Sequence, residues 1–168
     1  MVKVWKLGLM SYDTALKIQL AVARKHLDAM MKGLDVNYDT LLLVEHKPVF
    51  TVGIQGKRSP YTGVWVEDNK IASIGIHASR YVTTHGISLN CDNDLSWFDN
   101  IDPCGFEDKG VTSLTKESGM ECPIDKITPI FLRNFNKVFG CETEDLDVKI
   151  QEEILNTIYN KLMVQSVS

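Results

Sequence analysis

The apolar residues of this chain change their spacing along its length, and this change is what most limits the folds it can adopt. Spacing of three and four residues, typical of amphipathic helices, runs from Tyr12 to Met30 and again from Ile127 to Leu162. The stretch between them carries short apolar runs rich in β-branched and aromatic residues. Strands enclosed by helices predict an α+β domain, with a mixed β-sheet flanked by helices.

The first half is expected to begin with a strand over residues 2–7. A helix then opens at Ser11 and ends at Gly33. Two strands, 41–44 and 49–52, show little alternation, which is typical of strands buried on both faces. The predicted apolar face of the helix comprises Tyr12, Leu16, Leu20, Ala23, Leu27 and Met30.

The second half is expected to hold a hairpin, in which strands 64–66 and 70–76 are joined through Glu67-Asp68-Asn69. A strand over 87–91 and a short turn or helix over 94–101 follow. A helical tract stops at Gly140, and a last amphipathic helix closes the chain. The predicted faces of these two helices are Ile127, Phe131, Phe135, Val138 and Phe139, and Ile150, Ile154, Ile158 and Leu162.

The composition of the chain argues against several classes of function. The 18 basic and 22 acidic side chains give a formal net charge of −4, which argues against a nucleic-acid-binding stripe. The longest clean apolar run, 41–44, is far too short to cross a bilayer. No Cys-x-x-Cys pair, phosphate-binding loop or Gly-x-Gly-x-x-Gly motif occurs, so neither a metal nor a nucleotide cofactor is expected.

Cys104 is the first candidate for chemistry. Pro103 before it fixes φ and supplies no N–H, and Gly105 after it lets the backbone approach a ligand closely. A thiol in such a rigid turn is well placed for attack, and the amides after it could stabilise an oxyanion. The alternative is a buried apolar cysteine, which is the commoner case for a cysteine in general.

Lys70 and His85 are the other candidates. Lys70 heads the apolar strand 71–76, where its cation could lower the pKa of a nearby thiol; the alternative is a solvated lysine at a strand end. His85 could be the base of a Cys–His pair or a hydrogen-bonded structural histidine. The small residues 73–75 could admit a ligand or form a bulge.

Several motifs occur together in an order that resembles the lipoyl(octanoyl) transferase family, most closely the animal mitochondrial type. The resemblance covers residues 2–140. The matching stretches are 42–46, 48–53, 59–66, 70–75, 84–90, 94–98, 103–105 and 110–114.

The resemblance implies a fold related to biotin protein ligases, lipoate ligases and class II synthetases. It implies transfer of an octanoyl group from octanoyl-acyl carrier protein, through a cysteine thioester, to a lysine of a lipoyl domain. The acceptors would be the lipoyl domains of 2-oxoacid dehydrogenase complexes and the glycine cleavage H protein, in mitochondria, with no cofactor, nucleic acid or membrane partner. An ATP-dependent lipoate ligase is disfavoured, because Pro103-Cys104-Gly105 has no role in adenylation.

The same resemblance assigns roles to residues. Cys104 would be the nucleophile, Lys70 the cation that lowers its pKa, and His85 a structural residue. The acyl pocket would be lined by Ser73, Ile74, Gly75, Gly86, Ile87 and Ser88.

This chain differs from the family in one internal segment, and this difference changes the domain that we expect. Between about residues 53 and 59 the family carries a long segment with an Arg-Gly-Gly turn and a His-Gly-Pro-Gly-Gln motif, which supplies one pocket wall and part of the central sheet. This chain has only residues 54–58 there. We therefore expect a transferase domain over 1–140 with an internal deletion, followed by a C-terminal helical tail over 141–168. The alternative is a catalytically impaired or inactive isoform that acts at most as a binding module.

Overall fold

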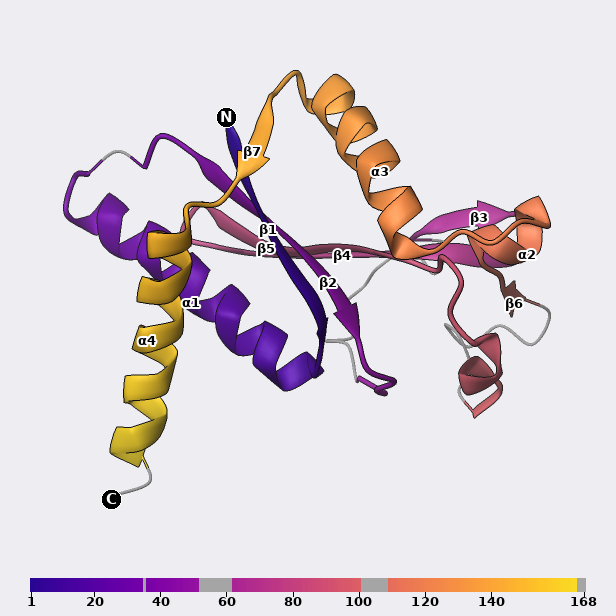
Figure 1. Cartoon of the computed structure of the whole chain (residues 1–168), viewed down its shortest axis with the longest axis horizontal. Coiled ribbons are helices and arrows are strands. Elements are labelled where there is room, and N and C mark those ends of the chain that lie inside the picture. The colour runs from indigo at the N-terminus through magenta and orange to yellow at the C-terminus, as the bar shows by residue number, and fades with distance from the viewer. Residues whose placement is uncertain (35, 52–61, 101–108, 166–168) are drawn as a thin grey trace. The chain divides into compact units, whose positions relative to one another are not determined.

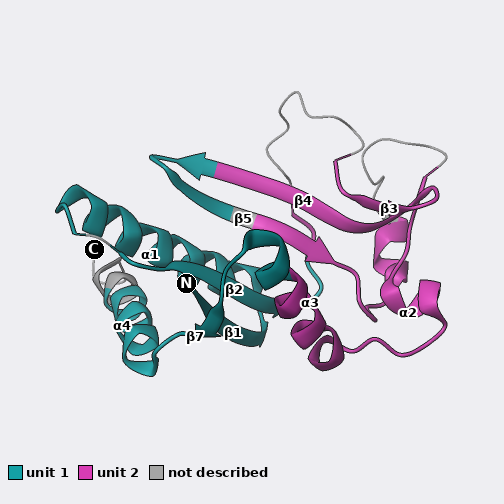
Figure 2. Ribbon diagram, turned by 90° about the horizontal axis from the view of Figure 1, so that it is seen from above, with its two compact units in different colours: residues 1–49, 78–84, 135–168 teal, residues 50–77, 85–134 magenta. Residues whose placement is uncertain are grey.

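Strands and helices of the chain form two compact units. The computed structural model describes residues 1–34, 36–51, 62–100 and 109–165. Unit 1 comprises residues 1–49, 78–84 and 135–168, and unit 2 comprises 50–77 and 85–134 (Figure 2). Helices accompany sheets with both parallel and antiparallel pairs, which confirms the predicted α+β class (Figure 1).

Unit 1 is arranged around strand β1 (Val2–Met10), the centre of a three-stranded sheet. On one side β1 pairs in parallel with β2 (Asp39–His46), and on the other with β7 (Thr143–Asp145). A parallel pair needs a crossover, and helix α1 (Tyr12–Met31) supplies it between β1 and β2. Ser11 accepts a hydrogen bond from the Thr14 N–H and caps this helix, as the sequence predicts.

The last segment of the chain contributes directly to the core of unit 1. Helix α4 (Val148–Gln165) packs against α1, and the two are also joined by a 2.6 Å ion pair between Lys25 and Glu153. The predicted face of α4 is confirmed for Ile150, Ile154 and Ile158. The segment expected as a helical tail therefore supplies a strand and a packed helix. The buried cluster consists of Trp5, Ile18, Val22, Leu146 and Ile154.

The predicted apolar face of α1 is wrong by about one position. Ala15, Ile18 and Val22 are buried, whereas Leu20 and Met30 are largely exposed. Apolar residues occupy more than half of the helix circumference, so spacing alone allows two stripes. Contacts with Trp5 of β1 and the α4 residues select the stripe that contains Ile18.

Three further expectations of burial are wrong. Residues 49–51 are irregular instead of a strand, Val49 and Phe50 are exposed, and Val52 lies outside the described residues. Within the described part of the chain β2 lies at the edge of its sheet, and it is only partly buried. Helix α3 (Ile124–Phe139) forms as predicted, but Val138 and Phe139 are exposed, because periodicity marks an apolar stripe without supplying a surface to cover it.

Unit 2 contains the predicted hairpin. β3 (Val64–Val66) and β4 (Asn69–Ser79) pair antiparallel, and β4 also pairs with β5 (Val82–Leu89), which begins earlier than expected. The short helix η1 (Leu95–Asn100) follows, as expected. The Ser96 backbone N–H donates to Asp94 at 2.9 Å and lowers the pKa of that carboxyl, so a charged side chain precedes η1.

The remaining elements of unit 2 are strand β6 (Gly110–Val111), which is parallel to β4, and helix α2 (Leu114–Ser118), which Ser113 caps. Among the helices of the described ranges, none has the length and apolar composition that crossing a membrane requires.

We predict that Ile154→Ala lowers the free energy of unfolding by about 2–5 kcal/mol, because Ile154 is 4% exposed and its truncation leaves a cavity in the unit 1 core. Urea unfolding measures the change. The matched control is Leu155→Ala in the same helix, where the side chain is 46% exposed and the expected change is within about 0.5 kcal/mol. Equal effects of the two variants would show that α4 does not pack on α1.

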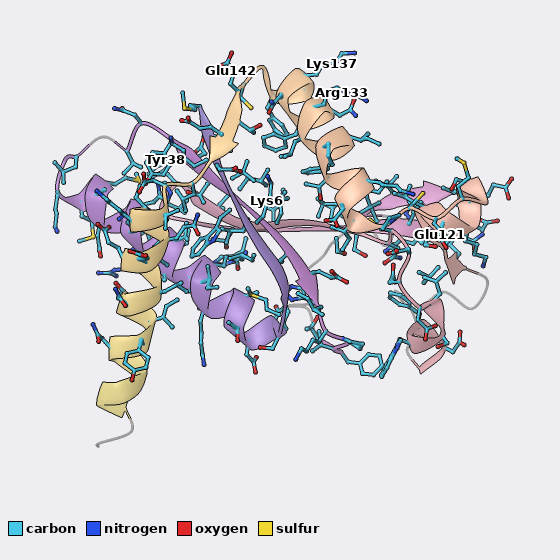
Figure 3. The ribbon with its side chains drawn as sticks, viewed as in Figure 1. Lys6, Tyr38, Glu121, Arg133, Lys137 and Glu142 are labelled. Atoms are coloured by element: carbon cyan, nitrogen blue, oxygen red, sulfur yellow. The ribbon has the colours of Figure 1, made fainter. Side chains whose placement is uncertain are left out.

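His26 is expected to make stability depend on pH. Its ring lies against Tyr38 (labelled in Figure 3) and within 3.1 Å of the Thr40 hydroxyl. Loss of water around the partly buried ring lowers the pKa of His26 below its ordinary value of 6.5; Asp39 opposes this change and Lys25 adds to it.

As the pH falls below 6.5, the unfolded chain takes up a proton at His26 before the folded chain does, so stability decreases. We predict that the free energy of unfolding falls more between pH 7.5 and pH 5.5 in the wild type than in His26→Gln. Parallel pH profiles of the two proteins would contradict this assignment.

Candidate functional site

Lys70 is the centre of the candidate site. It is the second residue of β4, and only 7% of its surface is exposed. The interpretation of Lys70 as a solvated strand-end lysine is therefore wrong. A charged side chain that has lost most of its water requires compensating interactions, so its neighbours indicate what the site can do.

The β3–β4 hairpin supplies the first of these neighbours. Trp65 is the antiparallel partner of Lys70, and the Lys70 Nζ lies 4.8 Å from the centroid of the indole ring. Gly63 directly precedes β3 in the chain. A Cβ at this position would lie 3.2 Å from Lys70 Cε and 2.6 Å from the Ala72 carbonyl oxygen. Gly63, at a φ of 145°, thus leaves the room that the lysine stem occupies.

Strand β6 lies beside the same two residues of β4. Its two members, Gly110 and Val111, pair with Asn69 and Lys70, and the Thr112 N–H donates to the Lys70 carbonyl at 3.0 Å. A Cβ at Gly110 would crowd the Asn69 amide oxygen, so a larger residue there would force the Asn69 side chain to move.

Lys109, immediately before β6, also approaches the tryptophan. Its ammonium forms a 2.6 Å ion pair with Asp68 and lies 5.5 Å from the Trp65 ring centroid. The Gly110 N–H adds a hydrogen bond to the Asp68 carbonyl at 3.1 Å. The β3–β4 turn therefore anchors the point where the chain enters β6.

Asn90 connects this region to β5. Its backbone N–H donates to the Ile71 carbonyl at 3.0 Å, and its side-chain amide donates to the Thr112 carbonyl, also at 3.0 Å. The Thr112 side chain is fully buried and donates to Glu117. These bonds fix the Lys70 end of β4 against both the end of β5 and the start of α2.

The sequence analysis proposed Lys70 as a candidate and gave no place to its neighbours Trp65, Asp68, Lys109 and Thr112. A signal for Trp65 was present: in a hairpin with the turn at 67–68, residues 65 and 70 lie opposite each other. Asp68 and Lys109 gave no local signal, because 41 positions separate them in the sequence.

Cys104, with Pro103 and Gly105, lies outside the described residues, and so does the side chain of His85. The cysteines that the structure does describe, Cys91, Cys122 and Cys141, are partly buried. Among the described residues, no group of three His, Cys, Asp or Glu side chains is arranged to hold a metal ion.

The six expected pocket residues lie on the neighbouring strands β4 and β5. The Asn90–Ile71 hydrogen bond and the two-residue turn between Ser79 and Val82 give the same register, in which Ile74 is opposite Ile87. The same register places Ser73 opposite Ser88 and Gly75 opposite Gly86. Ile74 and Ile87 are exposed, and alternation places Ile74 on the same face of β4 as Lys70.

We predict that Gly63→Ala lowers the free energy of unfolding by about 1–3 kcal/mol, because a φ of 145° is strained for alanine and its Cβ would crowd Lys70. Urea unfolding tests this. The control is Gly86→Ala, where a Cβ meets nothing within 4 Å. If both variants were equally stable, the close approach at Gly63 would be refuted.

Comparison with known proteins identifies the class to which this fold and site belong. Residues 52–136 match the lipoyl protein ligase A/B catalytic domain. The chain is 34% identical to a mitochondrial octanoyl-[acyl-carrier-protein]:protein N-octanoyltransferase of Danio rerio, over 83% of this chain and 93% of that protein. The chain therefore belongs to the lipoyl protein ligase A/B catalytic domain family.

Other relatives match over shorter lengths. A putative mitochondrial lipoyltransferase 2 of Drosophila melanogaster is 55% identical over 53% of this chain and 38% of its own length. A human mitochondrial octanoyl-[acyl-carrier-protein]:protein N-octanoyltransferase is 45% identical over 53% of this chain and 40% of its own length. In these two alignments the chain spans less than half of the relative.

The zebrafish alignment shows that this chain lacks residues that its relative has. The alignment extends over 212 positions, whereas 83% of 168 residues is about 139 residues, so about 70 positions of the relative face gaps. These gaps are internal to the alignment. Their expected location, between about residues 53 and 59, stays a prediction.

Proposed function

We propose that this chain is an octanoyltransferase that moves an octanoyl group from acyl carrier protein to a lysine of a lipoyl domain. The observation that carries the proposal is the buried Lys70, held beside β6 in a chain that matches the lipoyl protein ligase A/B catalytic domain. The names of the relatives from zebrafish and human support the donor and the acyl group.

Cys104 is assigned as the nucleophile and Lys70 as the cation that favours its thiolate. A positive charge near a thiol lowers the thiol pKa, and the effect is stronger where water is excluded, as it is around Lys70. Gly110, which pairs with Asn69, is six residues after Cys104. Six residues of chain extend over at most about 20 Å, and this short separation in sequence supports an approach of Cys104 to Lys70.

The reaction proceeds in two acyl transfers. The Cys104 thiolate attacks the thioester carbonyl of octanoyl-acyl carrier protein, a new thioester forms, and the carrier thiolate leaves and takes up a proton. The neutral amine of the acceptor lysine then attacks the Cys104 thioester. An amide forms, the amine loses a proton, and the Cys104 thiolate is regenerated. Backbone N–H groups after Cys104 are assigned to stabilise the oxyanion of each tetrahedral intermediate.

The acyl chain is assigned to the β4–β5 hairpin. Ile74 and Ile87 offer an apolar pair on adjacent strands, next to the small residues Ser73, Gly75, Gly86 and Ser88. Each methylene that is fully buried contributes about 0.8 kcal/mol, but Ile74 and Ile87 are exposed. A form that contains the missing segment would enclose the octanoyl chain better, so we expect this shorter chain to transfer octanoate more slowly.

The remaining assignments follow from the same proposal. Catalysis is assigned to residues 1–140, interrupted between about 53 and 59, with 141–168 as a supporting tail. The acceptors are the lipoyl domains of 2-oxoacid dehydrogenase complexes and the glycine cleavage H protein, and the compartment is the mitochondrion. The animal relatives are named mitochondrial, which supports the compartment.

We predict that incubation with octanoyl-acyl carrier protein adds one octanoyl group to this chain, detected by intact mass and mapped to Cys104. Cys104→Ala should give no adduct, while Cys91→Ala and Cys122→Ala should keep it. Lys70→Met should slow adduct formation at least about tenfold, the factor that one lost unit of thiol pKa depression implies, and Lys70→Arg should be less affected because it keeps the charge.

A lipoyl domain and a longer form carrying the missing segment complete the experiment. Transfer from the adduct to the acceptor lysine distinguishes an enzyme from a chain that only binds the carrier. An adduct on Cys91 or Cys122, or none on either form, would refute the proposal. An adduct on the longer form alone would establish the impaired isoform instead.

A further inference from the structure

We infer that Trp65 is a positioning residue, whose indole ring holds the Lys70 ammonium at the place where catalysis needs it. The two residues are cross-strand partners, and the Nζ lies 4.8 Å from the ring centroid, within the range of a cation–π interaction. The effect on Cys104 rests on the proposed function. The contact between Trp65 and Lys70 does not.

The surroundings of Lys70 make this contact important. The residue is 7% exposed, so water compensates little of its charge, and the attraction of a desolvated ammonium to an aromatic face is at its strongest. Because Gly63 has no side chain, the aliphatic part of Lys70 can lie close to the backbone that leads into β3. Register, glycine and ring all contribute to the orientation of the lysine.

A second cation shares the ring. The Lys109 ammonium lies 5.5 Å from the Trp65 centroid, and Asp68 pairs with it at 2.6 Å. The carboxylate neutralises Lys109, which limits the repulsion between two ammonium groups at one indole. Lys109 is five residues after Cys104 in the sequence. Trp65 therefore lies next to both Lys70 of the proposed dyad and a residue close in sequence to the thiol.

Fluorinated tryptophans test this role without changing the shape of the side chain. Each fluorine withdraws electron density from the ring and weakens its attraction for a cation. We would introduce mono-, di- and trifluorotryptophan at position 65 of the full chain by nonsense suppression. The matched control is the same series at Trp97, whose ring contacts Phe50 in the same unit.

Two rates are measured by peptide mass spectrometry at neutral pH. As the ring loses electron density, acetylation of Lys70 by an amine-reactive ester should accelerate, by roughly tenfold across the series, because the ammonium is held less firmly. Alkylation of Cys104 by iodoacetamide should slow, because less thiolate is stabilised. The Trp97 series should change neither rate.

The two rates separate the inference from the proposed function. Acetylation of Lys70 that does not respond to fluorination at Trp65 would overturn the positioning role, whatever Cys104 does. If Lys70 responds but Cys104 does not, the positioning role stands and the Lys70–Cys104 pairing fails. A role of Trp65 in packing alone predicts no trend, since the fluorinated rings keep their size and stacking position.

Discussion

A buried ammonium group is the constraint on which unit 2 depends. The surrounding elements supply part of what water would otherwise provide to Lys70: an aromatic face from β3, and backbone at Gly63 that leaves room for the lysine stem. The parallel bridge to β6 and the side-chain bond from Asn90 then fix the backbone on which the lysine is carried. The catalytic assignment is thus a consequence of local architecture as much as of residue type.

The sequence predicted elements better than it predicted their burial. The hairpin, η1 and the helices follow from turn residues and apolar spacing, which act within a few residues. The stripe of α1 that is buried depends on Trp5 and on α4, more than a hundred residues away, so it could not be read from the helix itself. The expected strand over 49–52 fails for a related reason, because a strand needs a partner as well as a propensity.

The residues of the candidate site also differ in whether local sequence patterns could indicate them. Lys70 was recognisable from the motif order of its family, and Trp65 could have been found from hairpin register. Asp68 and Lys109 meet only after β6 has paired with β4, an event that local patterns do not record. Ile74 and Ile87 illustrate a different limit: the hairpin register places them opposite each other, both are exposed, and their role in an acyl pocket stays a prediction.

The central position of β1 has a consequence for how the protein folds. The first strand of the chain pairs with β7, and Lys3 reaches Glu144 across 141 positions of sequence. Contacts between residues so far apart in the sequence slow folding. The chain must lose the conformational entropy of closing a long loop before these contacts can stabilise it. During synthesis on the ribosome, β1 therefore has to remain unsatisfied on one side until residues 143–154 have emerged. Until β7 pairs with it, the open edge of β1 is exposed to the chaperones and proteases that recognise unpaired strands.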